Sequence, residues 1–191
     1  MQTMTRRQLS NAARAATSRV PKTSAELAAY RSELLRLLEE AFAGPAWHGS
    51  SLRATLRGVD AELALWRAPG TQNRIWDLVN HATYTRHLVR RRLDPSNVEA
   101  FPMVVERSWW PRMELNDLAP DAAWKRDRAL LDKQHALLVE LVRELPAKRL
   151  AERRPGKKHV FGVEISGVAL HDTYHGGQIA LIRRMKRELA P

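Results

Sequence analysis

Four long stretches in which apolar residues recur about every 3.6 positions constrain the fold of this chain more than any other feature. The spacing predicts helices over about residues 25–43, 72–93, 122–145 and 162–189. No strand-like alternation and no internal repeat interrupts them. We therefore expect an all-α chain, an up-down four-helix bundle with a long crossover between the second and third helices.

Capping and breaking residues refine the expected helix bounds. Thr23 followed by Glu26 has the spacing of a capping box at the start of the first helix. A shorter helical piece, about residues 51–68, is expected to link the first and second helices. Thr71 is expected to cap the second helix.

Length and composition indicate one compact domain. The chain has 191 residues, of which 44% are apolar, enough for one sizeable core and too few for two full domains. We expect a single domain over residues 23–191, preceded by a basic, flexible tail over residues 1–22. No apolar run is long enough to span a bilayer and no secretory signal is recognisable, so we expect a cytoplasmic protein without membrane contact.

The net charge of +11 raises the question of nucleic-acid binding. Much of this charge lies in residues 1–22 and in residues 148–158, a stretch that we expect to form a loop. Neither stretch forms a regular basic helix face with interleaved aromatic residues. A solubilising surface is therefore the favoured interpretation, and nucleic acid is not an expected partner.

A polar column on the predicted last helix carries the strongest functional signal. His171 and His175 lie four residues apart, so their side chains leave one helix face and can bind one metal ion, and Gln178 continues the stripe. Gly176 and Gly177 lie in mid-helix, where each costs about 1 kcal/mol relative to alanine. Close approach of another helix or a ligand would offset that cost.

A third ligand is needed, and the other histidines differ in their surroundings. His81 is the best candidate because polar and apolar residues mix on its helix face. His135 is the reserve ligand, although a core-edge histidine hydrogen-bonded through one nitrogen is the favoured interpretation there. His87 and His159 are expected to be solvated, and His48 lies in a turn from which it could line a pocket mouth.

Other polar residues near these histidines are candidates for catalytic roles. Asp172 points away from His171 on the helix, so we expect it to orient a neighbouring group rather than bind metal. Tyr84 and Tyr174 are candidates for hydrogen bonds to substrate, and Gln178 is a further candidate. Four tryptophans either wall the pocket or belong to the core: Trp47, Trp76, Trp109 and Trp110.

The chain contains no cysteine. A disulfide framework and a thiolate metal site are therefore excluded, and any zinc must bind nitrogen and oxygen ligands. A thiol nucleophile, if the reaction uses one, has to come from a co-substrate.

Two motifs resemble the DinB-like (YfiT-like) family of metal-binding four-helix bundles. They are Leu78-Val-Asn-His81 and His171-Asp-x-Tyr-His175-x-Gly-Gln178-Ile. The agreement covers roughly residues 24–189 and extends to Trp47-His-Gly-x-Ser-Leu, Ile75-Trp76 and Leu181-Ile-Arg183. The resemblance implies that His81, His171 and His175 bind one divalent ion, zinc or nickel, with positions left open for water.

The same resemblance implies a class of reaction. Characterised relatives include transferases, and one isomerase, that use low-molecular-weight thiols. We expect a metal-dependent enzyme that activates such a thiol, or water, toward a small electrophilic substrate, in a chain that forms a homodimer. The alternatives are a non-catalytic binding module stabilised by metal and a metal-dependent hydrolase. A zincin peptidase is disfavoured because Asp172 replaces the catalytic glutamate and Leu181 replaces the third histidine of that motif.

Overall fold

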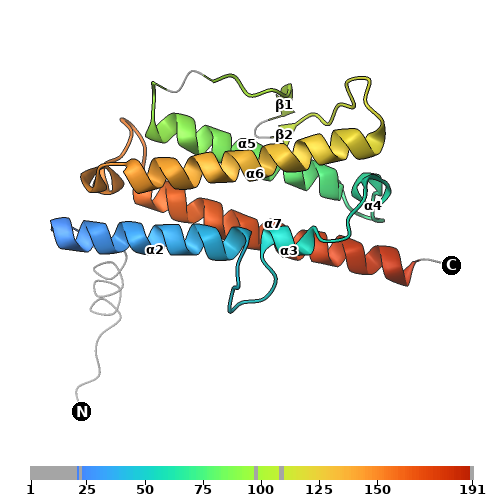
Figure 1. Cartoon of the computed structure of the whole chain (residues 1–191), viewed down its shortest axis with the longest axis horizontal. Helices are drawn as coiled ribbons and strands as arrows, with labels where there is room; N and C mark the ends of the chain where they lie inside the picture. The colour runs from blue at the N-terminus through green and yellow to red at the C-terminus, as the bar shows by residue number, and fades with distance from the viewer. Residues whose placement is uncertain (1–20, 22, 97–98, 108–109, 190–191) are drawn as a thin grey trace, which may run out of the picture.

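The structure, a computed structural model, describes residues 21, 23–96, 99–107 and 110–189. Four long helices form its body (Figure 1): α2 (Ser24–Phe42), α5 (Ile75–Leu93), α6 (Pro120–Glu144) and α7 (Phe161–Glu188). Shorter elements connect them: α3 (Leu52–Thr55), α4 (Ala61–Leu65), strands β1 (Val105–Arg107) and β2 (Trp110–Pro111), and a 3-10 helix, η1 (Ala147–Ala151). The predicted all-α bundle is confirmed.

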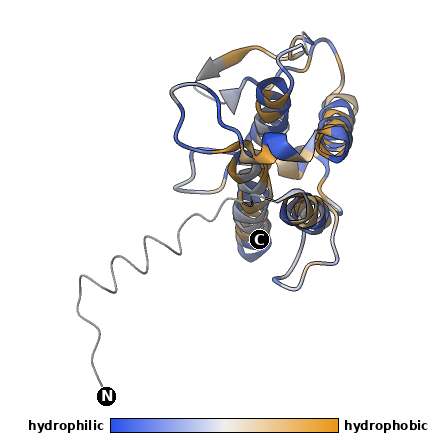
Figure 2. Ribbon diagram, turned by 90° about the vertical axis from the view of Figure 1, so that its left-hand side faces the viewer, coloured by the Kyte–Doolittle hydropathy of each residue, from blue (hydrophilic) through white to orange (hydrophobic). Residues whose placement is uncertain are grey.

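The four long helices pack as a square. Helix α2 contacts α6 and α7, and α5 contacts the same two helices from the other side. Figure 2 shows this bundle end-on. In Figure 1, α2 and α7 run in one direction while α5 and α6 run in the other. Because α5 and α6 follow one another and point the same way, the chain between them has to return along the whole bundle. This returning segment is the long crossover predicted from the sequence.

The crossover carries more order than the sequence indicates. Strands β1 and β2 pair antiparallel within it, with Val105 opposite Pro111 and Arg107 opposite Trp110. Strand β2 also packs against α5. This contact fixes Trp110 over the middle of the bundle, next to the helix that carries His81.

Of the two predicted helix caps, the one at the start of α2 is confirmed and the one at the start of α5 is wrong. At α2, the Thr23 side chain accepts from the Glu26 amide, and the Glu26 carboxylate accepts from the Thr23 amide. Thr71 does not cap α5, which begins four residues later, because the Asp77 carboxylate accepts a hydrogen bond of 2.8 Å from the Arg74 amide instead. The Thr71 hydroxyl donates to a backbone carbonyl in the preceding turn.

Two connecting segments also differ from expectation. The helical piece predicted over residues 51–68 is broken into α3 and α4, with Gly58 at φ +70° in the turn between them. Part of the predicted loop over residues 148–158 lies in η1. Its Arg149 pairs with Glu152 at 2.7 Å, so this basic stretch is partly neutralised within the fold.

Buried polar residues divide the core into two apolar clusters. One cluster surrounds Trp76 and Trp124, and the other surrounds Leu38 and Leu138. Along the helices, the residues between the clusters are buried and polar: Arg86 and His87 on α5, Gln134 and His135 on α6, and Asp172 and His175 on α7. Burying so many polar groups is costly unless they are paired, which points to a role for this layer.

Residues 1–20 and 22 lie outside the described residues, so the predicted tail stays a prediction. Within the described part of the chain, no helix combines the length and the apolar character needed to cross a bilayer. This finding agrees with the absence of a long apolar run in the sequence.

Candidate metal centre

Three histidines from two helices converge at one edge of the polar layer. His81 extends from α5, and His171 and His175 extend from successive turns of α7. The Nε2 atom of His171 lies 2.9 Å from Nε2 of His81 and 3.0 Å from Nε2 of His175. His81 and His175 are buried and His171 is partly buried. Their ligand atoms all lie within 4.8 Å of one another, so the three side chains could hold one metal ion.

A hydrogen bond fixes the orientation of one of these rings. Nδ1 of His175 lies 2.6 Å from Oε1 of Gln178, which can only accept. His175 therefore carries its proton on Nδ1, and the lone pair on Nε2 faces the other two histidines. Metal-binding histidines commonly have such a partner on the second ring nitrogen.

The surroundings keep the imidazoles neutral. Burial, helped by the neighbouring histidines and Arg86, lowers the pKa of His171 to about 3. Burial also lowers the pKa of His175 to about 4, although its hydrogen bond with Gln178 acts in the opposite direction. At neutral pH both rings are neutral, each with one N–H and one free lone pair, which is the form that binds a metal ion.

The nitrogen arrangement fits a divalent ion better than it fits a hydrogen-bond network. A neutral imidazole has one N–H, so Nε2 of His171 can donate to only one of its two nitrogen neighbours. Zinc–nitrogen bonds of about 2.0–2.1 Å at tetrahedral angles separate two ligand nitrogens by about 3.3 Å. The 2.9 and 3.0 Å separations need to open by only a few tenths of an ångström to reach that value.

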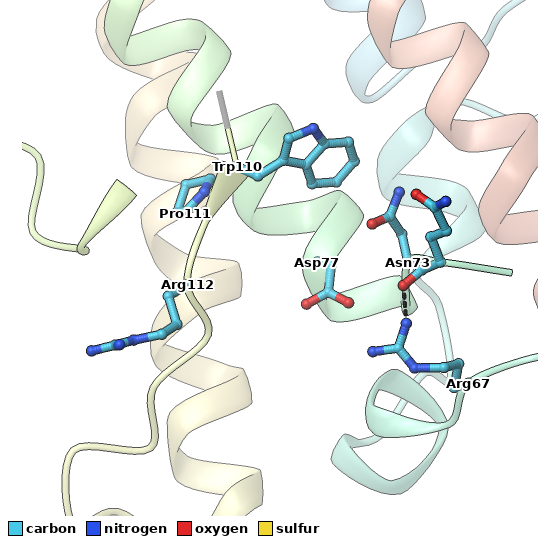
Figure 3. A pocket seen from close by; sticks show the side chains of 7 residues that line it. Arg67, Asn73, Asp77, Trp110, Pro111 and Arg112 are labelled. Carbon is cyan, nitrogen blue, oxygen red and sulfur yellow. Dashed lines mark hydrogen bonds between the residues drawn. The ribbon is translucent and has the colours of Figure 1, made fainter. Parts of the chain in front are cut away.

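Trp110 covers the centre from the crossover. Its ring stacks on the His81 imidazole, with centroids 4.0 Å apart and an interplanar angle of 9°. The same indole lines a cavity of about 380 Å³ (Figure 3), together with Asp77 and Arg67. The Arg112 guanidinium, on the strand side of this cavity, extends away from the indole in Figure 3. One wall of the centre is therefore also a wall of an open cavity.

A second cavity is lined by Gln178, the hydrogen-bond partner of His175. It has a volume of about 230 Å³, and Leu181 and Leu78 also line it. Gln72 and Asn73 line both cavities. Two neighbouring spaces for a small molecule are therefore lined by side chains that contact the histidines, Trp110 in one and Gln178 in the other.

An ion pair lies directly behind the centre. Arg86 of α5 donates to Asp172 of α7, and both side chains are fully buried. Burial raises the pKa of Asp172 to about 6 against the opposing effect of Arg86, so the carboxylate is still ionised at neutral pH. The pair joins the helix of His81 to the helix of His171 and His175. Within the described residues, Asp172 hydrogen-bonds none of the three imidazoles.

The other candidate residues take different positions. Tyr174 is 64% exposed, and its hydroxyl accepts a hydrogen bond of 3.3 Å from Gln178. Tyr84 packs against Phe101 of the crossover and lies near His87. Tyr174 therefore reaches the centre through Gln178, whereas the contacts of Tyr84 lie further along α5.

The reserve ligand, His135, is not part of the three-histidine group in the described structure. It stacks on Phe42 with ring centroids 3.8 Å apart. The structure shows it buried, as expected, but the expected hydrogen bond is absent: neither ring nitrogen has a hydrogen-bond partner among the described residues, and Nε2 lies 3.7 Å from the Glu39 carboxylate. Burial and nearby Arg86 and Arg53 lower its pKa to about 3.

Two further histidine predictions have opposite outcomes. His159 is exposed, as expected for its loop. The prediction that His87 is solvated is wrong: it is 1% exposed, because the crossover residue Phe101 packs over it. His48 is exposed in the turn after α2, next to Trp47.

The tryptophans divide between core and site. Trp76 is buried and donates a hydrogen bond of 2.7 Å to Asp127, and Trp47 is 91% exposed. Trp109 lies outside the described residues.

Sequence reasoning missed Arg86 as the partner of Asp172. The sequence does carry a signal for it: Arg86 lies seven residues from apolar Val79 on one side and from apolar Leu93 on the other. This spacing places Arg86 on the core face of α5.

Comparison with protein families supports the resemblance seen in the sequence. The family model described as the DinB superfamily matches residues 46–179, which include all three histidines. The chain matches no curated protein and no solved structure.

Proposed function

We propose that the chain, which belongs to the DinB superfamily, is a metal-dependent enzyme. In this enzyme His81, His171 and His175 hold one divalent ion, zinc or nickel. Its substrate is a small electrophilic molecule, and its co-substrate is a low-molecular-weight thiol. In this account the protein acts as a thiol transferase in the cytoplasm, where such thiols are kept reduced.

One observation carries this proposal: three imidazole nitrogens converge, and two side chains that contact them, Trp110 on His81 and Gln178 on His175, each line a cavity. Within the described residues, no fourth histidine or carboxylate belongs to the group. Structural zinc sites normally have four protein ligands, whereas catalytic sites have three and leave a position for substrate or water. The donor set therefore favours a catalytic ion over a purely structural one.

A divalent ion at this place would supply Lewis-acid chemistry, lowering the pKa of a thiol or water and polarising a substrate carbonyl. The protein itself supplies no thiol, since it has no cysteine. The residues of the chain position and shield the reactants. Gln178 holds His175 in one tautomer, and Trp110 covers the His81 ring and walls the larger cavity.

Tyr174 and Gln178 are the proposed groups for substrate contact. Gln178 lines the smaller cavity and is within hydrogen-bond reach of both His175 and the Tyr174 hydroxyl. An electrophile bound in this space would meet an amide and a hydroxyl on the α7 side. Asp172 takes a supporting role, since it is buried against Arg86.

A cobalt-substituted form of the full chain tests the function. We expect the visible spectrum to change when a small thiol such as 2-mercaptoethanol is added, because the thiol enters the open position. We also expect the loaded protein to accelerate addition of the thiol to a chromogenic electrophile, and His171→Ala to lose both signals.

The outcomes separate the candidate functions. A spectrum that ignores thiol, together with no thiol transfer, contradicts the transferase proposal. Hydrolysis of an activated ester without any thiol would instead favour a metal-dependent hydrolase. Full metal occupancy with neither activity would favour a binding module that metal only stabilises.

A further inference from the structure

The outward face of α7 is apolar and carries no exposed charge from Val163 to Leu181. Its large side chains are 43% exposed at Val163, 71% at Leu170, 64% at Tyr174 and 57% at Leu181. The remaining exposed positions in this stretch are Gly167, Thr173, Gly177 and Ala180. In a chain with 28% charged residues, an uncharged helix face of this length indicates a contact surface.

The spacing of these residues makes a straight stripe. Positions 163, 167, 170, 174, 177 and 181 follow one another in alternating steps of four and three, the heptad spacing by which one helix packs along another. We call these six residues the α7 stripe. It lies beside the histidines of α7 rather than over the core.

No close contact within the described chain requires glycine at two positions of the stripe. A Cβ atom at Gly167 or at Gly177 would meet nothing within 4 Å. The neighbouring Gly176 differs, since a Cβ there would contact Leu52 and Thr55 of α3. Glycine weakens a helix, so its presence at the two open positions is explained if another helix backbone approaches there.

Large side chains and glycines are arranged symmetrically in the stripe about residue 172. Val163 and Leu181 are equally far from that point, as are Gly167 and Gly177, and Leu170 and Tyr174. A two-fold axis through an antiparallel helix pair brings such residues together, large opposite large and glycine opposite glycine. We propose that the occupant of the α7 stripe is a second copy of this chain, with the two α7 helices antiparallel.

The charge of the chain and the size of the stripe limit how the two copies can meet. Two chains of net charge +11 repel each other, so they can meet closely only through a face without exposed charge. The stripe is about 27 Å long and one helix wide. Such a contact is smaller than the roughly 800 Å² per partner of a standard stable interface, so the dimer should dissociate on dilution.

The interface would adjoin the candidate metal centre. Tyr174 of the stripe accepts from Gln178, which in turn holds His175. Leu181 of the stripe also lines the smaller cavity. The partner's α7 would therefore form the outer rim of that cavity, although the dimer itself does not depend on metal or activity.

Sedimentation of the full chain over a range of concentrations tests the dimer. We expect a monomer–dimer equilibrium, and we expect Leu170→Glu to weaken association at least tenfold by placing like charges near the axis. Leu118→Glu is the matched control, since Leu118 is 40% exposed and lies outside α7. Circular dichroism checks that both variants fold. A chain that is monomeric at every concentration, or a dimer that Leu170→Glu leaves intact, overturns the proposal.

Cysteine cross-linking tests the pairing itself, and the chain has no native cysteine to interfere. In an antiparallel pair, position 167 faces position 177, whereas the two copies of position 167 lie about 15 Å apart along the axis. We expect a mixture of Gly167→Cys and Gly177→Cys to form a disulfide-linked dimer, and each variant alone to form far less. Efficient cross-linking of Gly167→Cys to itself would indicate parallel helices and overturn the arrangement.

Discussion

Arg86 and Asp172 form an ion pair that no water reaches, and it joins the two helices that carry the three histidines. Both side chains are fully buried, between α5 and α7. Arg86 also donates to the carbonyl of Ala82, one turn earlier on α5, and its guanidinium lies 4.9 Å from the centre of the Phe42 ring. The pair therefore sets how α5 faces α7, and with it the distance between His81 and the other two histidines.

Removing one partner of this pair should be costly. We expect Arg86→Met to lower the free energy of unfolding by about 3–5 kcal/mol, because Asp172 is left as a buried, unpaired charge. Arg143→Met is the control, since Arg143 pairs with Glu140 where both side chains are more than half exposed; its loss should be at most about 1 kcal/mol. Urea unfolding measures both. Equal losses would show that the buried pair has no special role.

Gln178 should control metal affinity without being a ligand. In Gln178→Leu, Nδ1 of His175 loses its acceptor, and we expect metal affinity to fall about 10- to 100-fold. Gln178→Glu keeps an acceptor and should restore most of it. Tyr174→Phe removes only the contact to the amide nitrogen of Gln178 and serves as control. Competition with a chromogenic chelator measures each affinity, and an unchanged value in Gln178→Leu would refute this role.

Trp110 should shield the His81 ring. In Trp110→Ala, the face of the imidazole that now stacks on the indole becomes accessible to water. We expect faster loss of bound metal to a chelator and a larger cavity open to substrate. Trp47→Ala removes an indole that is 91% exposed and should leave the metal release rate unchanged. If the two variants release metal at the same rate, Trp110 does not cover the centre.

Stability without metal should fall as the pH is lowered from about 6.5 toward 4. Burial lowers the pKa of His135 and His171 to about 3 and that of His175 to about 4, so in this window the unfolded chain binds more protons than the folded chain. Asp172, whose pKa is raised to about 6, binds its proton more readily in the folded chain and offsets one of the three. For these four groups the net of two protons gives a slope of about 3 kcal/mol per pH unit, and His87, whose pKa burial also lowers, acts in the same direction.

The contribution of one histidine to this slope can be measured separately, because His135 lies outside the metal centre. In His135→Leu, one of the three titrating histidines is gone, and we expect the slope near pH 5 to fall by up to about 1.4 kcal/mol per pH unit. Urea unfolding in the presence of a chelator at pH 5, 6 and 7 measures it. A slope equal to that of the unchanged protein would mean that His135 takes up its proton equally in the folded and unfolded chains.

The helices could be predicted from the sequence because their signal is local. The apolar spacing located all four long helices, and the Thr23 and Glu26 pattern located the first helix start. The Thr71 prediction failed because a threonine before a helix is also suited to the turn that it forms with Ala68. The choice between the two depends on Asp77, whose carboxylate accepts from the amide of Arg74, the residue directly before α5.

The site could be predicted only in part. The spacing of His171 and His175 fixes their common face, and the mixed polar and apolar face around His81 made it the best third candidate, which the resemblance also implies. The pairing of Arg86 with Asp172 could not be predicted, since it depends on how two helices are rotated against each other. The place of Trp110 follows from the path of the crossover, and the burial of His87 follows from the same path through Phe101. The path of the crossover leaves no periodic signal in the sequence.

The metal content and coordination of the untagged, full-length protein decide whether the three histidines form an open metal site. We expect one divalent ion per chain, bound by three imidazole nitrogens with one position open to exchangeable ligands, as X-ray absorption spectroscopy would report. Single alanine substitutions of His81, His171 and His175 should each abolish stoichiometric metal while keeping helical circular dichroism, and His135→Ala should keep the metal. Full occupancy in His171→Ala, or four protein ligands with metal lost in His135→Ala, would contradict the account.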